Sequence, residues 1–389
     1  MISLKRIILI WGAGRIGRGF VADIFDNPSY QTVFSDIDEE LIKSLNSARK
    51  YTIHKATRDG ISVKTIENGF SAFHTGDTDA LKEIFLSENL LLDIAVHAPK
   101  LKEVALQIAP LIAHRAKHAP NLPMDIMMNV NMASPDERFT QLLKERLPGD
   151  ALSYFNEKVG VTGIFAMCIS PVAPESILKT DPLALWNNGF HEQAIDKNRL
   201  KCTPPSLPRL RLTDDVVKEE TRKLYTLNMA HALICYLGLK KRLETSFDAV
   251  NDPEIRETLL SALSEAAYGL AHEYGFSTEE MDAWQKTIVS LLENPYIKDD
   301  LQRLGADTRR KLGAYDRLVG PARLCVKYGR EPYALSKAIR AGFDYENDDE
   351  GTRAVREYVK ANGVMKAAEK FSNLLPEDGI YHLVNKATI

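Results

Sequence analysis

A segment in the second half of the chain carries four polar side chains that could share one chemical task. They are Glu220, Lys223, Asn228 and His231, and from residue 224 to residue 237 all but three residues are apolar. An apolar run of this length is typical of a helix that is buried nearly all round. At about 100° per residue, the four side chains would project within an arc of about 140°. Polar groups on one side of a buried helix cost free energy unless each finds a partner.

These residue types suit the oxidation of a hydroxyl group. Lys223 would take the hydroxyl proton as a general base, provided that burial lowers its pKa from about 10.4 by about two to three pH units. Asn228 would donate a hydrogen bond to the developing alkoxide. His231 would orient the substrate hydroxyl, and Glu220 would relay protons. A plainer interpretation also fits: a buried helix with an ion pair at its start and two hydrogen-bonded polar groups in the core.

A glycine-rich turn near the N-terminus predicts a nucleotide site. The sequence GAGRIG at 12–17 follows the β-rich run Arg6–Trp11 and opens a segment with helical character. In such a turn the first glycine allows the tight bend, the second lets main-chain N–H groups approach a pyrophosphate, and the third lets the helix pack closely on the strand. The helix N-terminus adds oriented N–H groups and a partial positive charge. The residues predicted to bind the cofactor phosphates are Gly12, Gly14, Arg15, Ile16 and Gly17.

An acidic residue at the end of the second expected strand completes this pattern. Thr32–Ser35 reads as a strand, and Asp36 follows it, 19 residues after Gly17. A carboxylate at this spacing accepts hydrogen bonds from the adenosine ribose of a dinucleotide. Because it would also repel a 2′-phosphate, the sequence predicts NAD rather than NADP as cofactor.

The elements that must position these residues alternate between strand and helix in the first half of the chain. Together they predict an N-terminal, Rossmann-like, doubly wound sheet within an α/β fold. We assign this dinucleotide-binding domain to residues 1–200, and a proline-rich, irregular stretch near Asp181–Pro208 marks its end. Beyond the first two strands, the expected elements are strands at Ile61–Thr65, Leu91–His97, Asp125–Asn129 and Val159–Ile169, and a helix at Lys100–His118.

The second half, residues 201–389, is expected to be a mostly α-helical substrate and catalytic domain. The expected helices are Val216–Leu239, Pro253–Tyr274, Met281–Leu292, Pro332–Ala341 and Glu350–Phe371. The first of them carries the four polar side chains described above. The two groups of functional residues are therefore predicted on different domains.

Composition narrows the classes of partner. The chain has 389 residues, with 44% hydrophobic and 26% charged residues, which excludes disorder for most of it. A net charge of −3 gives no overall basic excess for nucleic acid or a membrane surface. The four cysteines stand far apart, so no zinc spacing occurs and reduced thiols are expected. We expect a cytoplasmic protein, a monomer or small homo-oligomer, that acts on a small molecule without a metal.

The spacing Lys223-x4-Asn228-x2-His231, with Glu220 before it, resembles the signature of the polyol-specific long-chain dehydrogenases. The stretches GAGRIGRGF, RKLYTLNMAHALICYLG, ENPYIKDDLQRLG and RKLGAYDRL are also similar to this family. The resemblance runs over nearly the whole length in the same order. It implies a zinc-independent, NAD-dependent enzyme with a lysine general base. It further implies exchange between a polyol phosphate and a ketose phosphate, with mannitol 1-phosphate and fructose 6-phosphate as the favoured pair.

Three more site residues follow from the resemblance. Asn131 matches an asparagine that pairs with Asn228 around the alkoxide, although an asparagine at a strand end is also common in turns. Arg303 and Lys311 match substrate-binding positions. They lie in a window from 298 to 323 that holds seven basic and four acidic residues. Such donors suit a phosphate ester, although a charged run is also typical of a solvated helix face.

One departure from the family bears on the substrate. Relatives carry an Asp-Arg pair before the domain boundary, where this chain has Met167-Cys168. Two alternatives therefore stay open. One is a dehydrogenase for an unphosphorylated polyol or a sugar acid. The other is a non-catalytic NAD-binding sensor.

Overall fold

The computed structural model describes residues 5–67, 69–132, 134–190 and 192–388. The chain divides into two compact units: residues 1–56 with 60–216, and residues 57–59 with 217–389. The crossing at Val216 lies beyond the proline-rich stretch. The reason is that β11 (Leu210–Thr213), at the end of that stretch, pairs with β10 (Gln193–Asp196) and so extends the sheet of the first unit.

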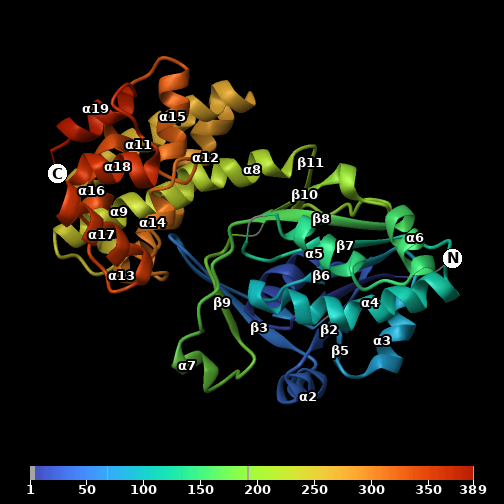
Figure 1. The fold of residues 1–389 in the computed structure, drawn as a ribbon. Helices are drawn as coiled ribbons and strands as arrows, with labels where there is room; N and C mark the ends of the chain where they lie inside the picture. Colours follow the sequence, from blue (N-terminus) through green and yellow to red (C-terminus); the bar gives the residue numbers. More distant parts are fainter. Residues whose placement is uncertain (1–4, 68, 133, 191, 389) are drawn as a thin grey trace. The chain divides into compact units, whose positions relative to one another are not determined.

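An eight-stranded sheet forms the centre of the first unit (Figure 1). Its order is β11-β10-β8-β7-β6-β1-β2-β5, and the pairs from β8 to β5 are all parallel. This part has the strand order of a doubly wound dinucleotide-binding sheet, so the predicted fold class is confirmed. The remaining strands are β1 (Arg6–Trp11), β2 (Tyr30–Asp36), β5 (Ser71–His74), β6 (Leu90–Ile94), β7 (Met124–Met128) and β8 (Val159–Ala166).

The two faces of this sheet are buried in two separate apolar clusters. Leu9 and Trp11 of β1 point into one cluster, and Ile8 and Ile10 point into the other. This alternation is what a strand covered by helices on both faces requires. The covering helices are α1 (Ala22–Phe25), α2 (Glu39–Ala48), α3 (Thr78–Phe85), α4 (Leu101–His118), α5 (Pro135–Lys144) and α6 (Gly149–Lys158).

A smaller sheet of three strands braces the helix that follows the glycine turn. It joins β3 (Tyr51–Thr57), β4 (Gly60–Ile66) and β9 (Leu185–Asn187). The predicted strand at 61–65 belongs here rather than to the main sheet. Asn187 Nδ2 donates to the Gly19 carbonyl at 2.8 Å, and the Tyr51 hydroxyl donates to the Arg18 carbonyl at 3.0 Å. Both bonds fix the backbone just after the turn.

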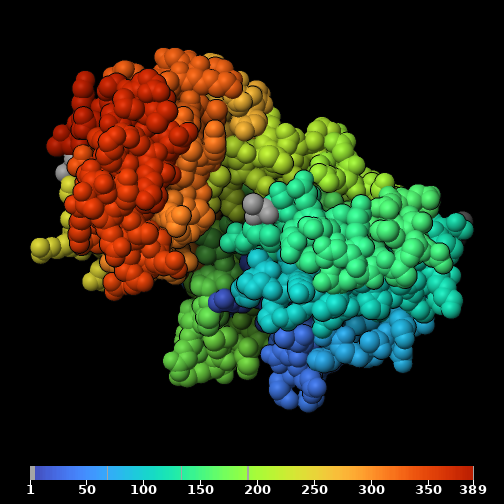
Figure 2. All heavy atoms as spheres, in the orientation of Figure 1, coloured from blue at the N-terminus to red at the C-terminus, as the bar shows by residue number. Residues whose placement is uncertain are grey.

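The second unit is built from helices around one long central helix. This helix runs through α8 (Val216–Lys223), a π-helical segment η4 (Leu224–Asn228) and α9 (Met229–Lys240). Its α9 part packs against α10 (Ser246–Asn251), α11 (Pro253–Tyr274), α13 (Leu301–Gly305) and α16 (Tyr333–Asp344). In Figure 2, side chains fill the spaces between the helices of this unit. The other helices are α12 (Thr278–Leu292), α14 (Thr308–Lys311), α15 (Val319–Lys327), α17 (Glu350–Asn362), α18 (Val364–Ser372) and α19 (Gly379–Lys386).

Two expected elements are corrected. The helix predicted over Glu350–Phe371 is interrupted at Gly363, whose φ of +84° does not fit a right-handed helix. The strand predicted over Val159–Ile169 ends at Ala166, and Asn188 then holds the extended chain through the Met167 carbonyl and the Ile169 N–H. No helix among the described residues is long and apolar enough to cross a membrane.

Candidate active site

The glycine turn at the end of β1 can be built only with glycine at two positions. Gly12 has a φ of +106°, and a Cβ there would lie 2.4 Å from the Ala95 carbonyl oxygen. A Cβ on Gly17 would lie 2.0 Å from the Gly12 carbonyl oxygen. No described residue comes within 4 Å of a Cβ built on Gly14, which is exposed. The turn is therefore closed from within at Gly12 and Gly17 and accessible at Gly14, as the approach of a pyrophosphate requires.

Arg18 fixes this turn, a role that the sequence reading did not assign to it. Its side chain is 8% exposed, Nε donates to the Ala13 carbonyl at 2.6 Å, and a terminal nitrogen donates to the Leu183 carbonyl at 2.8 Å. Arg15 is exposed and Ile16 half-buried at the start of the helix. An arginine directly after the third glycine was the signal available in the sequence. Its buried side chain holds the loop while the residues before it face outward.

Asp36 lies beside the turn. One carboxylate oxygen accepts from the Ala13 N–H at 2.7 Å, and the other accepts from the Asp38 N–H at 3.1 Å. Each carboxylate oxygen can accept a second hydrogen bond. Asp36 is half-buried, so a ribose hydroxyl can reach it. The turn, the helix start and this carboxylate together fit a dinucleotide whose ribose carries no 2′-phosphate.

The carboxyl ends of β6 and β7 carry a second polar group. Asn129 Nδ2 donates to Asp93 Oδ2 at 2.5 Å, and Asp93 is fully buried. Burial raises the pKa of the Asp93 carboxyl to about 8, against the opposing effect of this hydrogen bond. Asn131 follows two residues later and is exposed. Asp93 thus anchors the loop on which the predicted alkoxide ligand Asn131 lies.

In the second unit, the π-helical segment changes the predicted directions of the catalytic side chains. The earlier value of about 140° assumed a uniform α-helix and is wrong for this reason. A π turn closes over one more residue and rotates about 80° per residue rather than about 100°. Through η4, Asn228 moves to about 40° from Lys223, and His231 to about 20° on its other side. With Glu220 at about 60°, the four side chains fall within about 80°.

The surroundings of His231 show which charged groups gather near it. Burial lowers the pKa of His231 to about 4, and Arg317, Arg303 and Lys223 lower it further while Asp299 opposes them. The imidazole is therefore neutral near pH 7, with one nitrogen as donor and the other as acceptor. Lys223, Glu220 and Asn228 are half-buried. The predicted residues Lys223, His231 and Arg303 thus belong to one cluster, together with Arg317.

The two predicted substrate-binding residues lie in different environments. The Arg303 side chain is 65% exposed and pairs with Asp299 through Nε at 3.1 Å. Lys311 is buried, its amine donates to the Leu304 carbonyl, and burial with the nearby Arg317 lowers its pKa to about 8. Arg303 can therefore meet a ligand from solvent, whereas Lys311 is held inside the unit.

Several other basic residues of the 298–323 window have structural partners. Arg310 pairs with Asp307 at 2.6 Å, and Arg323 donates to the Asn373 carbonyl at 2.6 Å at the end of α18. Lys298 lies over the Phe247 ring at 5.3 Å. The local excess of positive charge is thus only partly directed at a ligand.

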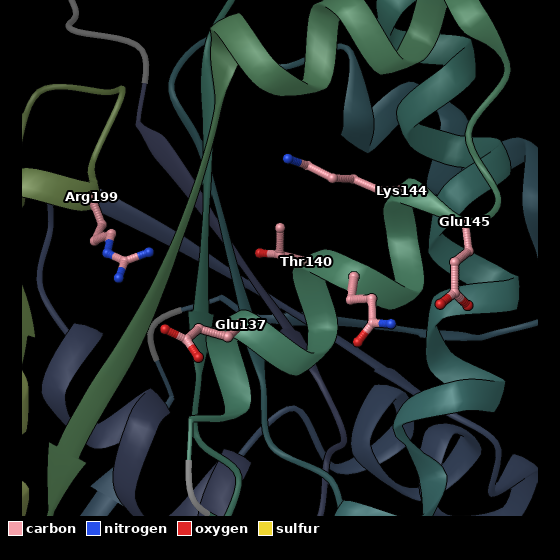
Figure 3. A pocket seen from close by; sticks show the side chains of 6 residues that line it. Glu137, Thr140, Lys144, Glu145 and Arg199 are labelled. Carbon is pink, nitrogen blue, oxygen red and sulfur yellow. The ribbon is translucent and has the colours of Figure 1, made fainter.

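An open hollow of about 550 Å³ lies along α5 in the first unit (Figure 3). It is lined by Glu137, Thr140, Gln141, Lys144, Glu145 and Arg199. None of the predicted site residues is among these lining residues. The mixture of charges gives it no preference for an anion or a cation.

A dinucleotide turn on a doubly wound sheet and a lysine–asparagine–histidine face on a helical unit define a two-domain dehydrogenase. Two family models cover the chain: the mannitol dehydrogenase Rossmann domain at residues 6–209 and the mannitol dehydrogenase C-terminal domain at residues 215–388. The protein therefore belongs to the mannitol dehydrogenase family and is an oxidoreductase. The predicted resemblance to polyol-specific dehydrogenases is confirmed.

Individual relatives agree with this assignment. Mannitol-1-phosphate 5-dehydrogenase of Bacillus velezensis is 30% identical over 382 residues, which cover 98% of this chain and 99% of the relative. The structure of a substrate-free D-sorbitol dehydrogenase has a TM-score of 0.83 at 15% identity, covering 98% of this chain and 92% of that one. The Pseudomonas fluorescens mannitol 2-dehydrogenase complex with NAD and D-mannitol has a TM-score of 0.67 at 14% identity, covering 98% and 94%. The predicted NAD cofactor agrees with this family.

Proposed function

We propose that this protein is an NAD-dependent dehydrogenase that interconverts a polyol phosphate and a ketose phosphate, with mannitol 1-phosphate and fructose 6-phosphate as the preferred pair. The observation that supports this most directly is the cluster of Lys223, Arg303 and His231, in which a candidate base adjoins an exposed guanidinium. The full-length similarity to a mannitol-1-phosphate 5-dehydrogenase adds to it.

In this proposal the first unit binds NAD, which accepts the hydride from the carbinol carbon. Main-chain N–H groups at Gly14, Arg15 and Ile16 face the pyrophosphate, because the turn is accessible at Gly14 and the helix begins there. Asp36 binds the adenosine ribose through the remaining acceptor capacity of its carboxylate. The residues present thus fit the cofactor that the family uses.

Lys223 takes the proton of the substrate hydroxyl as the C–H bond breaks. For each polyol oxidised, the carbinol carbon loses a hydride and its oxygen loses a proton, which leaves the ketone. The amine must be uncharged to accept this proton, and Glu220, one turn earlier on the helix, carries it onward to water. In the reverse direction the protonated amine returns the proton to the alkoxide oxygen.

Two asparagines and the histidine act on the reacting oxygen. Asn228 and Asn131 donate side-chain N–H groups to the oxygen as negative charge develops on it. His231, neutral near pH 7, orients the hydroxyl by accepting or donating one hydrogen bond. The carbon skeleton is then held with its reactive oxygen next to the base, which is the main requirement for rate in such a reaction.

The phosphate specificity depends on Arg303. Its guanidinium is largely exposed and can form two parallel hydrogen bonds with a phosphate. Its pairing with Asp299 opposes this binding, because an anion would have to compete with the carboxylate. Lys311 contributes to the positive charge from beneath through the shared neighbour Arg317.

A dehydrogenase for an unphosphorylated polyol or a sugar acid is the second candidate. It is favoured by the absence of the family's Asp-Arg pair, since Met167 is buried and Cys168 half-buried at that position. The non-catalytic NAD-binding sensor is a third and rests on the same departure. These candidates place the same demands on the glycine turn and differ at the substrate.

The test is a comparison of initial rates with NAD and each substrate in turn: mannitol 1-phosphate, D-mannitol, D-sorbitol and a sugar acid. We expect kcat/KM for mannitol 1-phosphate to exceed the others by at least about tenfold, and Arg303→Ala to remove most of that preference through KM. Saturation by an unphosphorylated substrate alone would favour the second candidate. NAD binding without turnover of any of these substrates would favour the sensor.

A further inference from the structure

The helix that carries the proposed catalytic residues does not wind uniformly. Over Leu224–Asn228 it forms a π segment, and the Met229 N–H donates to the Leu224 carbonyl, five residues back. Such segments contain one residue more than the α-helix needs and are frequent at functional sites. Something must hold the extra residue, because an uninterrupted α-helix has the better hydrogen-bond geometry.

Thr226 occupies the middle of this segment and has a defined pair of partners. It is fully buried, and its hydroxyl lies 2.6 Å from the Arg222 carbonyl and 2.9 Å from Trp284 Nε1. The indole N–H can only donate, so the hydroxyl oxygen accepts from it and the hydroxyl proton points to the carbonyl. A hydroxyl bonded to the carbonyl four residues back competes with the helical ladder and bends helices.

Trp284 holds the same turn by a second contact. The guanidinium of Arg222 lies over the Trp284 ring at 4.0 Å and over the Phe276 ring at 4.8 Å. The same guanidinium pairs with Glu219. Trp284, from α12, therefore fixes both the side chain of Arg222 and, through Thr226, its main-chain carbonyl, one residue before Lys223.

Tyr225 anchors the next position of the segment. Its hydroxyl donates to the Tyr315 carbonyl at 3.1 Å. Its ring lies so close to Gly320 that a Cβ there would be 2.4 Å from the ring. The π segment is thus gripped by α12 through Thr226 and by the start of α15 through Tyr225.

We propose that Thr226 and Trp284 are positioning residues for catalysis: their hydrogen bonds maintain the π turn that brings Asn228 and His231 round to the side of Lys223. This inference rests on the proposed function, because it assigns the turn to the chemistry of those three side chains. Without the π turn, Asn228 would point about 100° further from Lys223. A misplacement of about 1 Å can cost about 100-fold in rate.

The test compares Thr226→Val, which removes the hydroxyl and keeps the shape, with Thr226→Ser, which restores the hydroxyl. Thr258 provides the matched control, since it is also nearly buried and its hydroxyl donates to the Glu254 carbonyl at 2.9 Å within α11. We expect Thr226→Val to lower kcat by about 10- to 100-fold with NAD affinity unchanged. Thr226→Ser and Thr258→Val should each stay within about threefold of the parent.

Three further measurements separate positioning from a merely structural role. The melting temperature of each variant shows how much of any loss is unfolding. The pH profile of kcat/KM should change in Thr226→Val, because the base is displaced from its neighbours, and should not change in Thr258→Val. A crystal structure of Thr226→Val should show the Met229 N–H bonded to the carbonyl of Tyr225 instead of Leu224. Trp284→Phe, which removes the indole N–H, should reproduce the same change.

The outcomes distinguish this inference from the proposed function. If the parent oxidises the polyol phosphate and Thr226→Val matches its kcat, or if the π turn persists in both Thr226→Val and Trp284→Phe, the inference is wrong and the proposed function stands. If Thr258→Val loses as much kcat as Thr226→Val, the effect is general destabilisation and the inference is also wrong. A parent without any polyol turnover overturns the proposed function and this inference with it.

Discussion

The choice of NAD over NADP should depend on the charge of Asp36. In Asp36→Asn the side chain keeps its size, and one of the two main-chain N–H groups that it accepts from, at Ala13 and Asp38, can keep an acceptor. The change therefore removes mainly the negative charge. We expect it to weaken NAD binding and to strengthen NADP binding.

The expected size follows from the surroundings of this carboxylate. A hydrogen bond to a charged group contributes about 1 to 2 kcal/mol more than a neutral one, so NAD binding should weaken by about 5- to 30-fold. A 2′-phosphate about 4 Å away is repelled by about 1 kcal/mol in water and about 4 kcal/mol at an effective dielectric constant of 20. Because Asp36 is half-buried, the true value lies between these limits. The NAD-to-NADP preference should thus fall by about 2 to 6 kcal/mol, or at least about 30-fold.

The assay is the ratio of kcat/KM for NAD to that for NADP, with a fluorescence titration of NADH and NADPH as a check that needs no substrate. Asp38→Asn is the control, because it removes the same charge two residues away. Asp38 caps α2 by accepting from the Leu41 N–H at 3.0 Å, and asparagine can take over that role. A parent that prefers NADP, a change below about threefold in Asp36→Asn, or an equal change in Asp38→Asn would contradict this account of the turn.

Three further predictions concern the base, the turn and the core of the first unit. Lys223→Ala should lower kcat by about 10²–10⁴-fold with NADH binding retained, and turnover within about tenfold of the parent would remove the base assignment. Gly17→Ala should abolish measurable NADH binding, because the added carbon would lie 2.0 Å from the Gly12 carbonyl oxygen; unchanged binding would show that the turn can shift. Asp23 pairs with Lys55 at 2.7 Å, and hydrogen bonds from its basic partners, against the effect of burial, lower its pKa from 3.8 to about 2. It should stabilise the fold by about 2 kcal/mol above pH 4, an effect lost as the pH falls to 2, so in urea unfolding the stability gap between the parent and Asp23→Asn should narrow over that range.

Much of the first unit could be predicted because its signals are local. The strand Arg6–Trp11 has the predicted bounds, and the predicted strand at 32–35 lies within Tyr30–Asp36. The role of Gly17 follows from a close approach that every such turn needs. The role of Arg18 did not follow, because its partners Ala13 and Leu183 come from distant parts of the chain.

The second unit shows where such reading fails. The chain from 216 to 239 was rightly predicted to be helical, yet apolar periodicity assumes a single winding angle. The π turn depends on Trp284 of another helix, so no pattern within the segment could reveal it. The burial of Lys311 could not be predicted either, since a lysine among charged neighbours usually faces solvent.

The extra residue between α8 and α9 limits how this chain can change in length. Deleting one residue there would rotate all of α9 by about a quarter turn and shorten the helix by about 1.5 Å. Ala232, Leu233, Ile234 and Cys235 are almost completely buried, so the core surrounds α9 on every side. Gly238 leaves no slack, since a Cβ there would lie 2.8 Å from a Leu301 methyl. Insertions and deletions in this unit should therefore accumulate in the connecting loops, and the number of residues from Lys223 to Gly238 is fixed by packing as firmly as by catalysis.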